Sequence, residues 1–508
     1  MNQEKRQNNL IKTFVASTAS ILTASLLNLI ITPYITDCVG TEAYGFVSLA
    51  KQFVIYASLL TVALNSFAVR YISMDYHKNR YDEANCFFNS VFWGDLLLII
   101  AISIVLSFCL FVMDGILKIP DYLVFDVRIL FIIVFFNFFI TTIFTAFSAS
   151  AYIADKLYIV AAANCIGYVI EGGILFLFFK FISNKVYYVG LAMVPVSLII
   201  GLTDLWICKK YTPELSVKKD KFDRKDLRTL LTGGIWTSVN SAGEILNNGL
   251  DLLVCNLMLS SMQMGQLAIT RIISTMFQKI YLIVDKPFQP VFLKYYANDD
   301  KEGLLEQLLF SMKISSALVN IGFSCICSLG LVFYRLWIPN QDTELIYYLT
   351  VIGLLTTIPG GSMHPLYYIY ILTVKKVIPA AITIIGGLLN VAAMYLLIKY
   401  TNLGIYSIVW TTVVVMYIIN FITNPIYMAY VLHFKWYVFY PTLLRNTFSC
   451  FVMVMICCVL ESMIRPIAVP AFIMCAVLFA FLGAGLHFLI AFSNNEKERI
   501  IKYVLKVR

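Results

Sequence analysis

Long uninterrupted apolar runs constrain the fold of this chain more than any other feature. About 14 segments of roughly 20 or more mostly apolar residues follow one another along the sequence. A run of that length crosses the hydrocarbon core of a bilayer as a helix, and the runs do not alternate as strands do. We therefore predict transmembrane helices over 14–36, 46–69, 87–113, 128–153, 157–182, 186–208, 230–259, 264–292, 310–333, 345–374, 377–399, 403–432, 441–463 and 468–492.

The composition excludes several classes of protein. Hydrophobic residues make up 60% of the chain and charged residues 13%, whereas about 25% of a soluble domain is charged. A soluble enzyme, a nucleic-acid binder and a disordered chain are excluded. The 12 cysteines are scattered without a Cys-x-x-Cys pair, and the four histidines are dispersed. We predict no disulfide frame, metal site, cofactor or catalytic site, and hence no enzyme.

Lysine and arginine set the orientation in the membrane. With both termini on the cytoplasmic side, the inside loops and tails carry a roughly fourfold excess of these residues. The net charge of +9 is explained by this topology. The first apolar run is too long for a signal peptide and lacks a cleavage site, so it is predicted to be retained. The basic residues predicted on the cytoplasmic side form two main groups. The group in and around the linker is Lys209, Lys210, Lys218, Lys219, Lys221, Arg224, Lys225 and Arg228, and the group in the tail is Lys497, Arg499, Lys502, Lys506 and Arg508.

A weak internal repeat divides the chain in two. At an offset of 220 residues Asn28 aligns with Asn248, Gly45 with Gly265 and Lys51 with Arg271. Six helices per half return the chain to the same side, so the repeat is parallel about an axis along the membrane normal. We predict an N-terminal lobe at 1–211, a basic cytoplasmic linker at 212–229, a C-terminal lobe at 230–432, and two further helices with a basic tail at 433–508. Repeats of this kind enclose a central cavity and work by alternating access, which favours a transporter.

Basic residues inside the apolar runs are candidates for substrate binding. Lys51 and Arg271 occupy equivalent positions roughly 10 Å below the outer loops, and Lys279 continues along the face of Arg271. Charges at this depth need water, a partner or a function. A cavity lined in this way would bind pyrophosphate or another acidic group. The alternative is structural pairing with acids of the C-terminal half, Asp285, Glu244 and Asp251.

The seventh predicted helix carries a polar stripe. Glu244, Asn248 and Asp251 fall on one face of a continuous helix. Lipid does not tolerate such a face, so it lines water or another helix. The stripe predicts either a coupling site for Na⁺ or H⁺ or a buried seam that pairs with the basic residues.

Two segments resemble a known family. The run from Thr32 to Lys51 resembles the first outer loop of bacterial polysaccharide flippases, and 285–295, with its Pro-Phe-Gln-Pro core, resembles the region after their eighth helix. The acidic loop at 298–303 agrees with the same family. This is the Wzx-type polysaccharide transporter branch of the multidrug/oligosaccharidyl-lipid/polysaccharide exporters. The resemblance implies a fold like that of the multidrug and toxic compound extrusion (MATE) proteins, with two lobes in a V.

The resemblance also implies a function. The expected protein flips an undecaprenyl-pyrophosphate-linked oligosaccharide (an O-antigen, capsule or exopolysaccharide repeat unit) from the cytoplasmic to the outer leaflet of the bacterial plasma membrane. Its partners would be membrane lipid and the lipid-linked substrate, with a polysaccharide polymerase and glycosyltransferases acting beside it, and no nucleic acid. A cation-coupled exporter of drugs or small molecules with the same fold is the alternative. A membrane-embedded glycan polymerase or acyltransferase is disfavoured by the short outer loops.

Overall fold

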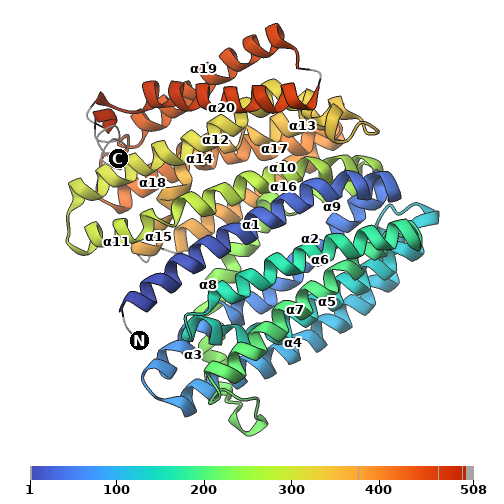
Figure 1. Ribbon diagram of the computed structural model, residues 1–508, viewed down its shortest axis with the longest axis vertical. Coiled ribbons are helices and arrows are strands. Elements are labelled where there is room, and N and C mark those ends of the chain that lie inside the picture. Colours follow the sequence, from blue (N-terminus) through green and yellow to red (C-terminus); the bar gives the residue numbers. More distant parts are fainter. Residues whose placement is uncertain (1–2, 374, 376, 467, 495, 499–508) are drawn as a thin grey trace. The chain divides into compact units, whose positions relative to one another are not determined.

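A computed structural model describes residues 3–373, 375, 377–466, 468–494 and 496–498, and all regular secondary structure in this range is helical (Figure 1). Twelve helical stretches of the described chain, each made of one or more consecutive helices, are long and apolar enough to cross a membrane. The remaining two predicted spans, 230–259 and 264–292, are also helical but more polar. The prediction of an all-α membrane protein is confirmed. The basic tail beyond Glu498 lies outside the described residues.

The contacts divide the chain into two compact units, Met1–Ala268 and Ile269–Arg508. The boundary falls inside the tenth helix, downstream of the linker predicted at 212–229. The two units are defined by contacts within the chain, whereas the predicted division rests on the sequence repeat and the helix count. The division at 1–211, 212–229, 230–432 and 433–508 therefore stays a prediction.

The first unit contains ten α-helices, the last of which it shares with the second unit, and two short 3-10 turns, η1 (Asp121–Leu123) and η2 (Lys219–Lys221). The α-helices are α1 (Gln3–Val39), α2 (Thr41–Asn65), α3 (Ala68–His77), α4 (Tyr81–Ile116), α5 (Val124–Ile153), α6 (Leu157–Phe181), α7 (Tyr187–Tyr211), α8 (Arg224–Asn248), α9 (Asp251–Met258) and the first turns of α10 (Ser261–Asp285). α7 packs against both α5 and α6, and α1 packs on α6 (Figure 1). The side chains of Phe108 and Phe111 on α4 are 67% and 83% exposed, as expected for a helix face in contact with lipid.

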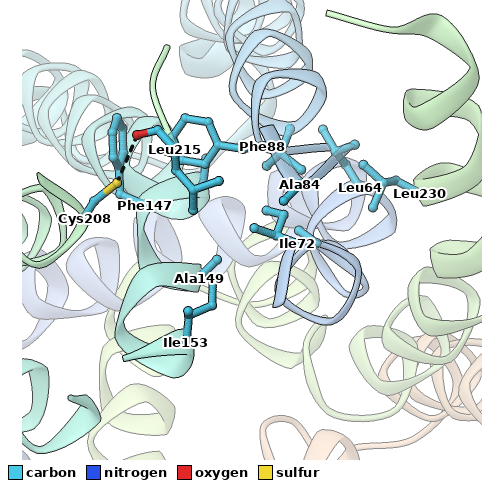
Figure 2. Close-up of a cluster of buried hydrophobic side chains, with 13 residues drawn as sticks. Leu64, Ile72, Ala84, Phe88, Phe147, Ala149, Ile153, Cys208, Leu215 and Leu230 are labelled. Carbon is cyan, nitrogen blue, oxygen red and sulfur yellow. Dashed lines mark hydrogen bonds between the residues drawn. The ribbon is translucent and has the colours of Figure 1, made fainter. Parts of the chain in front are cut away.

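An apolar cluster holds α2, α3, α4, α5 and α7 together (Figure 2). Phe88 of α4 packs edge-on against Phe147 of α5, with ring centroids 5.2 Å apart. Leu64 and Ile72 close the cluster from α2 and α3, and both are buried. Close packing of these side chains stabilises the contact between the helices.

The basic linker between α7 and α8 is fixed to α4. Asn89 donates from Nδ2 to the Ser216 carbonyl (2.9 Å) and accepts from the Lys218 amide (2.7 Å). Asn85 accepts from the Ser216 amide (3.1 Å), and Asp223, which caps α8, exchanges hydrogen bonds with Ser90. These bonds satisfy backbone groups that have no helical partner. The linker is therefore an ordered part of the first unit.

The second unit contains the rest of α10 and the helices that follow. They are α11 (Phe288–Ala297), α12 (Lys301–Trp337), α13 (Thr343–Leu354), α14 (Thr357–Met363), the 3-10 turn η3 (His364–Tyr367), α15 (Tyr368–Leu372), α16 (Val377–Tyr400), α17 (Tyr406–Tyr417), the π turn η4 (Ile418–Thr423), α18 (Asn424–Val431), α19 (Tyr440–Ile464) and α20 (Val469–Ala491).

Proline explains where the tenth predicted span is interrupted. Residues 359–361, Pro-Gly-Gly, predict a break, but they lie within α14, and the break comes earlier, between Leu354 and Thr357. Pro359 has no N–H to offer the carbonyl four residues before it, and its ring crowds that carbonyl. The Leu355 carbonyl accepts instead from the Ile358 amide (3.1 Å) in a tighter turn.

The last two helices pack on α12 through polar contacts. The ammonium of Lys313 on α12 contacts both carboxylate oxygens of Glu496 at 2.7 Å. His487 of α20 bridges Ser449 of α19 and the Lys313 carbonyl, each at 3.0 Å. A buried ammonium needs such a partner, because an isolated charge in an apolar interior is costly. α19 and α20 are thus integrated into the second unit.

Candidate functional site

A cavity of about 170 Å³ lies inside the first unit, between α1, α2, α6 and α7. Its volume leaves room for several water molecules. Polar side chains from three of the four helices face it, which a span surrounded only by lipid would not tolerate. The lining consists of Ala24, Leu27, Asn28, Ile31, Thr32, Ile35, Tyr44, Val47, Ser48, Lys51, Tyr168, Glu171, Leu175, Val189 and Met193.

Lys51 reaches this cavity from α2. Gly40 precedes α2 with a φ of 89°, a conformation that a residue with a Cβ rarely adopts. The helix then runs unbroken, and positions 44, 48 and 51 fall on one face. Tyr44, Ser48 and Lys51 all line the cavity, and the Lys51 side chain is half-buried. The predicted intramembrane cation therefore lies in a polar cavity of its own unit.

Glu171 brings a carboxylate to the same cavity from α6. It acts electrostatically on Lys51, and no ion pair within 4.0 Å involves either residue among the described part of the chain. The cavity thus holds two opposite charges with space between them. Water or a bound ionic group can occupy that space.

Sequence reasoning missed Glu171 as a site residue. The acid was visible in an apolar run, but nothing near it in the sequence is basic. Only the packing of α1, α2, α6 and α7 brings it to Lys51, 120 positions away. Tyr168, three residues earlier on α6, lines the same cavity and has the spacing of one helix face.

The predicted acidic stripe is divided by a helix break. α8 ends at Asn248 and α9 begins at Asp251, so the continuous helix assumed for Glu244, Asn248 and Asp251 is wrong. Tyr56 of α2 donates its hydroxyl hydrogen to the Gly249 carbonyl at the break, at 2.5 Å.

The three stripe residues differ in burial. Glu244 is exposed and accepts a hydrogen bond from Asn240 (2.9 Å), Asn248 is exposed, and Asp251 is buried. A helix break is a common location for ion sites in membrane proteins. The coupling role of the three residues stays a prediction.

Arg271 and Lys279 lie on α10 in the second unit, and both are half-buried. They are eight residues apart, which places their side chains about 80° apart around the helix axis. Lys51 belongs to the first unit, so the prediction that the three line one cavity stays a prediction. Among the described residues, no group of three or more His, Cys, Asp and Glu side chains could hold a metal.

The fold is that of known membrane transporters. The lipid II flippase MurJ in an inward closed conformation aligns with 94% of this chain and 97% of its own at a TM-score of 0.67 and 15% identity. An inward-facing MATE multidrug transporter of the MOP superfamily aligns with 82% and 98%, at a TM-score of 0.66 and 14% identity. The chain thus has the MATE-like fold that the sequence predicted.

Sequence comparison gives the family. Residues 10–295 match the family model described as polysaccharide biosynthesis protein. The membrane protein EpsK of Bacillus subtilis (strain 168), itself described as uncharacterised, is 25% identical over 496 residues, which covers 97% of this chain and 98% of EpsK. This chain belongs to the polysaccharide biosynthesis protein family, and the predicted resemblance is confirmed. It is a multi-pass membrane protein.

Proposed function

We propose that this protein is a flippase that carries an undecaprenyl-pyrophosphate-linked oligosaccharide from the cytoplasmic to the outer leaflet of the bacterial plasma membrane by alternating access. Membership of the polysaccharide biosynthesis family and the MATE-like fold support transport of a lipid-linked sugar. The observation that carries the proposal is Lys51 in a polar cavity within a membrane-spanning unit. Glycosyltransferases would supply the substrate and a polymerase would consume it.

Lys51 offsets the charge of the pyrophosphate. Moving an anion into the bilayer costs several kcal/mol, and a fixed cation reduces that cost. Glu171 provides a counter-charge for Lys51 within the cavity. An arriving phosphate would replace Glu171 as the partner of Lys51. In this proposal the pyrophosphate enters the cavity and the sugars lie outside it.

We extend the proposal to the second unit. Arg271 and Lys279 on α10 are the further candidates for contact with acidic groups of the substrate. Arginine presents a planar fork that matches phosphate, and lysine a point charge. Glu244, Asn248 and Asp251 remain candidates for coupling to Na⁺ or H⁺.

Glu171 keeps one alternative open. A cavity with a carboxylate and the aromatic side chain of Tyr168 is also suited to a cationic compound. A cation-coupled exporter of small molecules would bind its substrate there and would need Glu171 rather than Lys51.

The experiment compares lysine variants in a strain that lacks its own copy of the gene. We expect Lys51→Ala to lower surface polysaccharide at least about tenfold, equivalent to about 1.4 kcal/mol, and Lys51→Arg to retain part of it. Lys180→Ala is the matched control, because Lys180 is exposed at the end of α6 and should leave export unchanged. Immunoblots of the membrane fraction would verify equal protein levels.

The outcomes separate the candidate functions. Normal surface polysaccharide in a well-expressed Lys51→Ala, Arg271→Ala double variant would refute the basic site. If Glu171→Gln, but not Lys51→Ala, abolished transport and made the strain sensitive to cationic drugs, the exporter would be favoured. Lipid-linked repeat units accumulating on the outer leaflet of a deletion strain would instead indicate a polymerase.

A further inference from the structure

Three interrupted helices of the second unit are joined by polar side chains. α10 ends at Asp285 ahead of Pro287, the turn η3 begins at His364, and the π turn η4 precedes α18. Helix interruptions inside a membrane protein free backbone groups and are frequent at ion sites. The side chains at these interruptions form two linked groups, an acid–imidazole pair and a tyrosine–asparagine network.

Asp285 and His364 form the pair. Nδ1 of His364 and Oδ2 of Asp285 share a hydrogen bond. The side chain of Asp285 is 11% exposed and that of His364 is 31% exposed. Oδ1 of Asp285 is buried and has no hydrogen-bond partner among the described residues. A carboxylate in such surroundings is costly unless its charge is neutralised.

An aromatic ring holds the pair in place. Tyr281, one turn before Asp285 on α10, stacks on the His364 imidazole with centroids 4.6 Å apart and 20° between the planes. Its hydroxyl donates to the Thr357 carbonyl of α14 (3.4 Å). Stacking restricts the rotation of the imidazole, and a cation over an aromatic face is stabilised. The contact thus fixes the orientation of the His364 ring beside Asp285.

The network leads from η3 to the third interruption. Tyr367 contacts the His364 ring edge-on and donates to Oδ1 of Asn420 in η4 (2.6 Å). Asn424 at the start of α18 donates to the Tyr367 hydroxyl (3.2 Å) and accepts from Tyr370 of α15 (2.9 Å). His364 is therefore connected to the π turn through its ring contact with Tyr367 and the hydrogen bond from Tyr367 to Asn420.

We propose that Asp285 and His364 form a proton-binding site that couples transport to a transmembrane proton gradient. Neutral His364 beside ionised Asp285 carries one net negative charge, and uptake of one proton gives an imidazolium–carboxylate pair with no net charge. The imidazole of His364 is the more exposed of the two partners and is where the proton would bind. The proposal rests on the proposed function, because it names the ion that drives the flippase.

Other ionisable groups lie on the elements around the pair. Tyr281 and Tyr367 contact it directly. Of the elements packed on η3, α14 has no titratable side chain, α15 has only Tyr368 and Tyr370, and Lys313 of α12 is paired with Glu496. Lys279 lies on α10 six residues before Asp285. Lys286 directly follows Asp285 and is exposed.

The chemistry favours a proton over Na⁺. Sodium prefers several oxygen ligands, whereas this pair offers one carboxylate and an imidazole. The loaded pair is a charge-assisted hydrogen bond, which is stronger than the bond between a carboxylate and a neutral imidazole. Proton binding therefore tightens the link between α10 and η3, and proton release loosens it. Each transport cycle would pass through both states.

The test uses full-length protein in vesicles of phosphatidylethanolamine and phosphatidylglycerol. The probe is undecaprenyl-pyrophosphate that carries one fluorescent hexose, and a membrane-impermeant quencher reports its leaflet. A second dye inside the vesicles reports proton uptake. Gel filtration and thermal unfolding in detergent first verify that Asp285→Asn and His364→Gln are folded as the wild type is.

A pH gradient of one unit then separates coupled from uncoupled protein. One proton per probe molecule permits up to about tenfold accumulation across the membrane. We expect accumulation and proton uptake in the wild type and in the control His433→Gln, where the exposed His433 lies in a surface turn. Both single variants should lose accumulation. The double variant Asp285→His, His364→Asp, which restores the pair in reverse, should recover part of it.

Each other outcome overturns a defined claim. If Asp285→Asn and His364→Gln accumulate the probe as the wild type does, this site is not the coupling site. If the wild type moves the probe but responds only to a Na⁺ gradient or to no gradient, proton coupling fails and the flippase stands. If the wild type does not move the probe, the flippase assignment fails, and the coupling proposal fails with it.

Discussion

Gly45 on α2 and Gly265 on α10 face each other at close range within the first unit. A Cβ added to Gly45 would lie 2.9 Å from the Gly265 Cα, and one added to Gly265 would lie 2.2 Å from the Thr41 carbonyl oxygen. Ser261 donates to Glu42 at 3.0 Å beside them. The repeat in the sequence pairs these two glycines, and small residues allow two helix backbones to approach this closely in a membrane.

Gly45→Ala or Gly265→Ala should therefore destabilise the protein. The new methyl group meets backbone rather than a flexible side-chain end, so the helices must move apart, at a cost of about 1–3 kcal/mol. Thermal unfolding in detergent would measure the loss. Gly173→Ala is the control, because nothing lies within 4 Å of a Cβ at Gly173, and it should match the wild type or exceed it. Equal melting of all three variants would contradict the close contact.

Lys51 and Glu171 should show coupled stabilities. Lys51→Ala leaves Glu171 inside a membrane-spanning helix without its counter-charge, which costs about 2–3 kcal/mol on insertion scales. Glu171→Gln should lose less than Lys51→Ala, because a lysine can extend toward water. The double variant should be more stable than Lys51→Ala alone, as measured by unfolding in detergent. Additive losses in the double variant would show that the two charges do not interact.

Asn89→Ala should release the basic linker. The change removes the acceptor for the Lys218 amide and the donor to the Ser216 carbonyl. Trypsin should then cleave at Lys218 and Lys219 several-fold faster than in the wild type, because local opening exposes the backbone. Asn184→Ala, at an exposed loop position, should not change the cleavage rate. Unchanged cleavage in Asn89→Ala would mean that the linker is held by other contacts.

The Lys313–Glu496 pair predicts a loss of stability in acid. Burial alone would raise the pKa of Glu496, but the hydrogen bonds from Lys313 and Ser493 outweigh it and hold the pKa below its ordinary value of 4.5. A carboxyl group with a depressed pKa stabilises the fold above its unfolded pKa. That contribution is lost as the pH falls below about 4.5 through the folded pKa.

Glu496→Gln should remove this pH dependence. It should also lower the free energy of unfolding at neutral pH by about 2 kcal/mol, because Lys313 loses a charged partner. Unfolding monitored in detergent between pH 3 and pH 7 would show both effects. Glu302→Gln, at an exposed position of α12, should retain the acid transition. An acid transition that persists in Glu496→Gln would assign it to other carboxyl groups.

The sequence by itself determined that the chain lies in a lipid bilayer and that its secondary structure is helical. Apolar runs of about 20 residues admit only helices in a bilayer, because every backbone group must be paired within its own segment. The intramembrane lysine at position 51 and the interruption of the tenth span could be predicted for the same reason, since a charge or a proline in such a run is conspicuous. The segments 230–259 and 264–292 were also predicted to be helical, although the break of the first at Gly249 was not.

Only the tertiary structure decided which polar groups meet. Lys51 and Glu171 are 120 positions apart, and Asp285 and His364 are 79 apart. No helical periodicity relates residues on different helices, because their contact depends on how each helix is rotated and on which neighbours it packs against. The same reason explains why Glu496 could not be assigned to Lys313. Local patterns give each helix its exposed and polar faces, and packing alone selects the partner that each face meets.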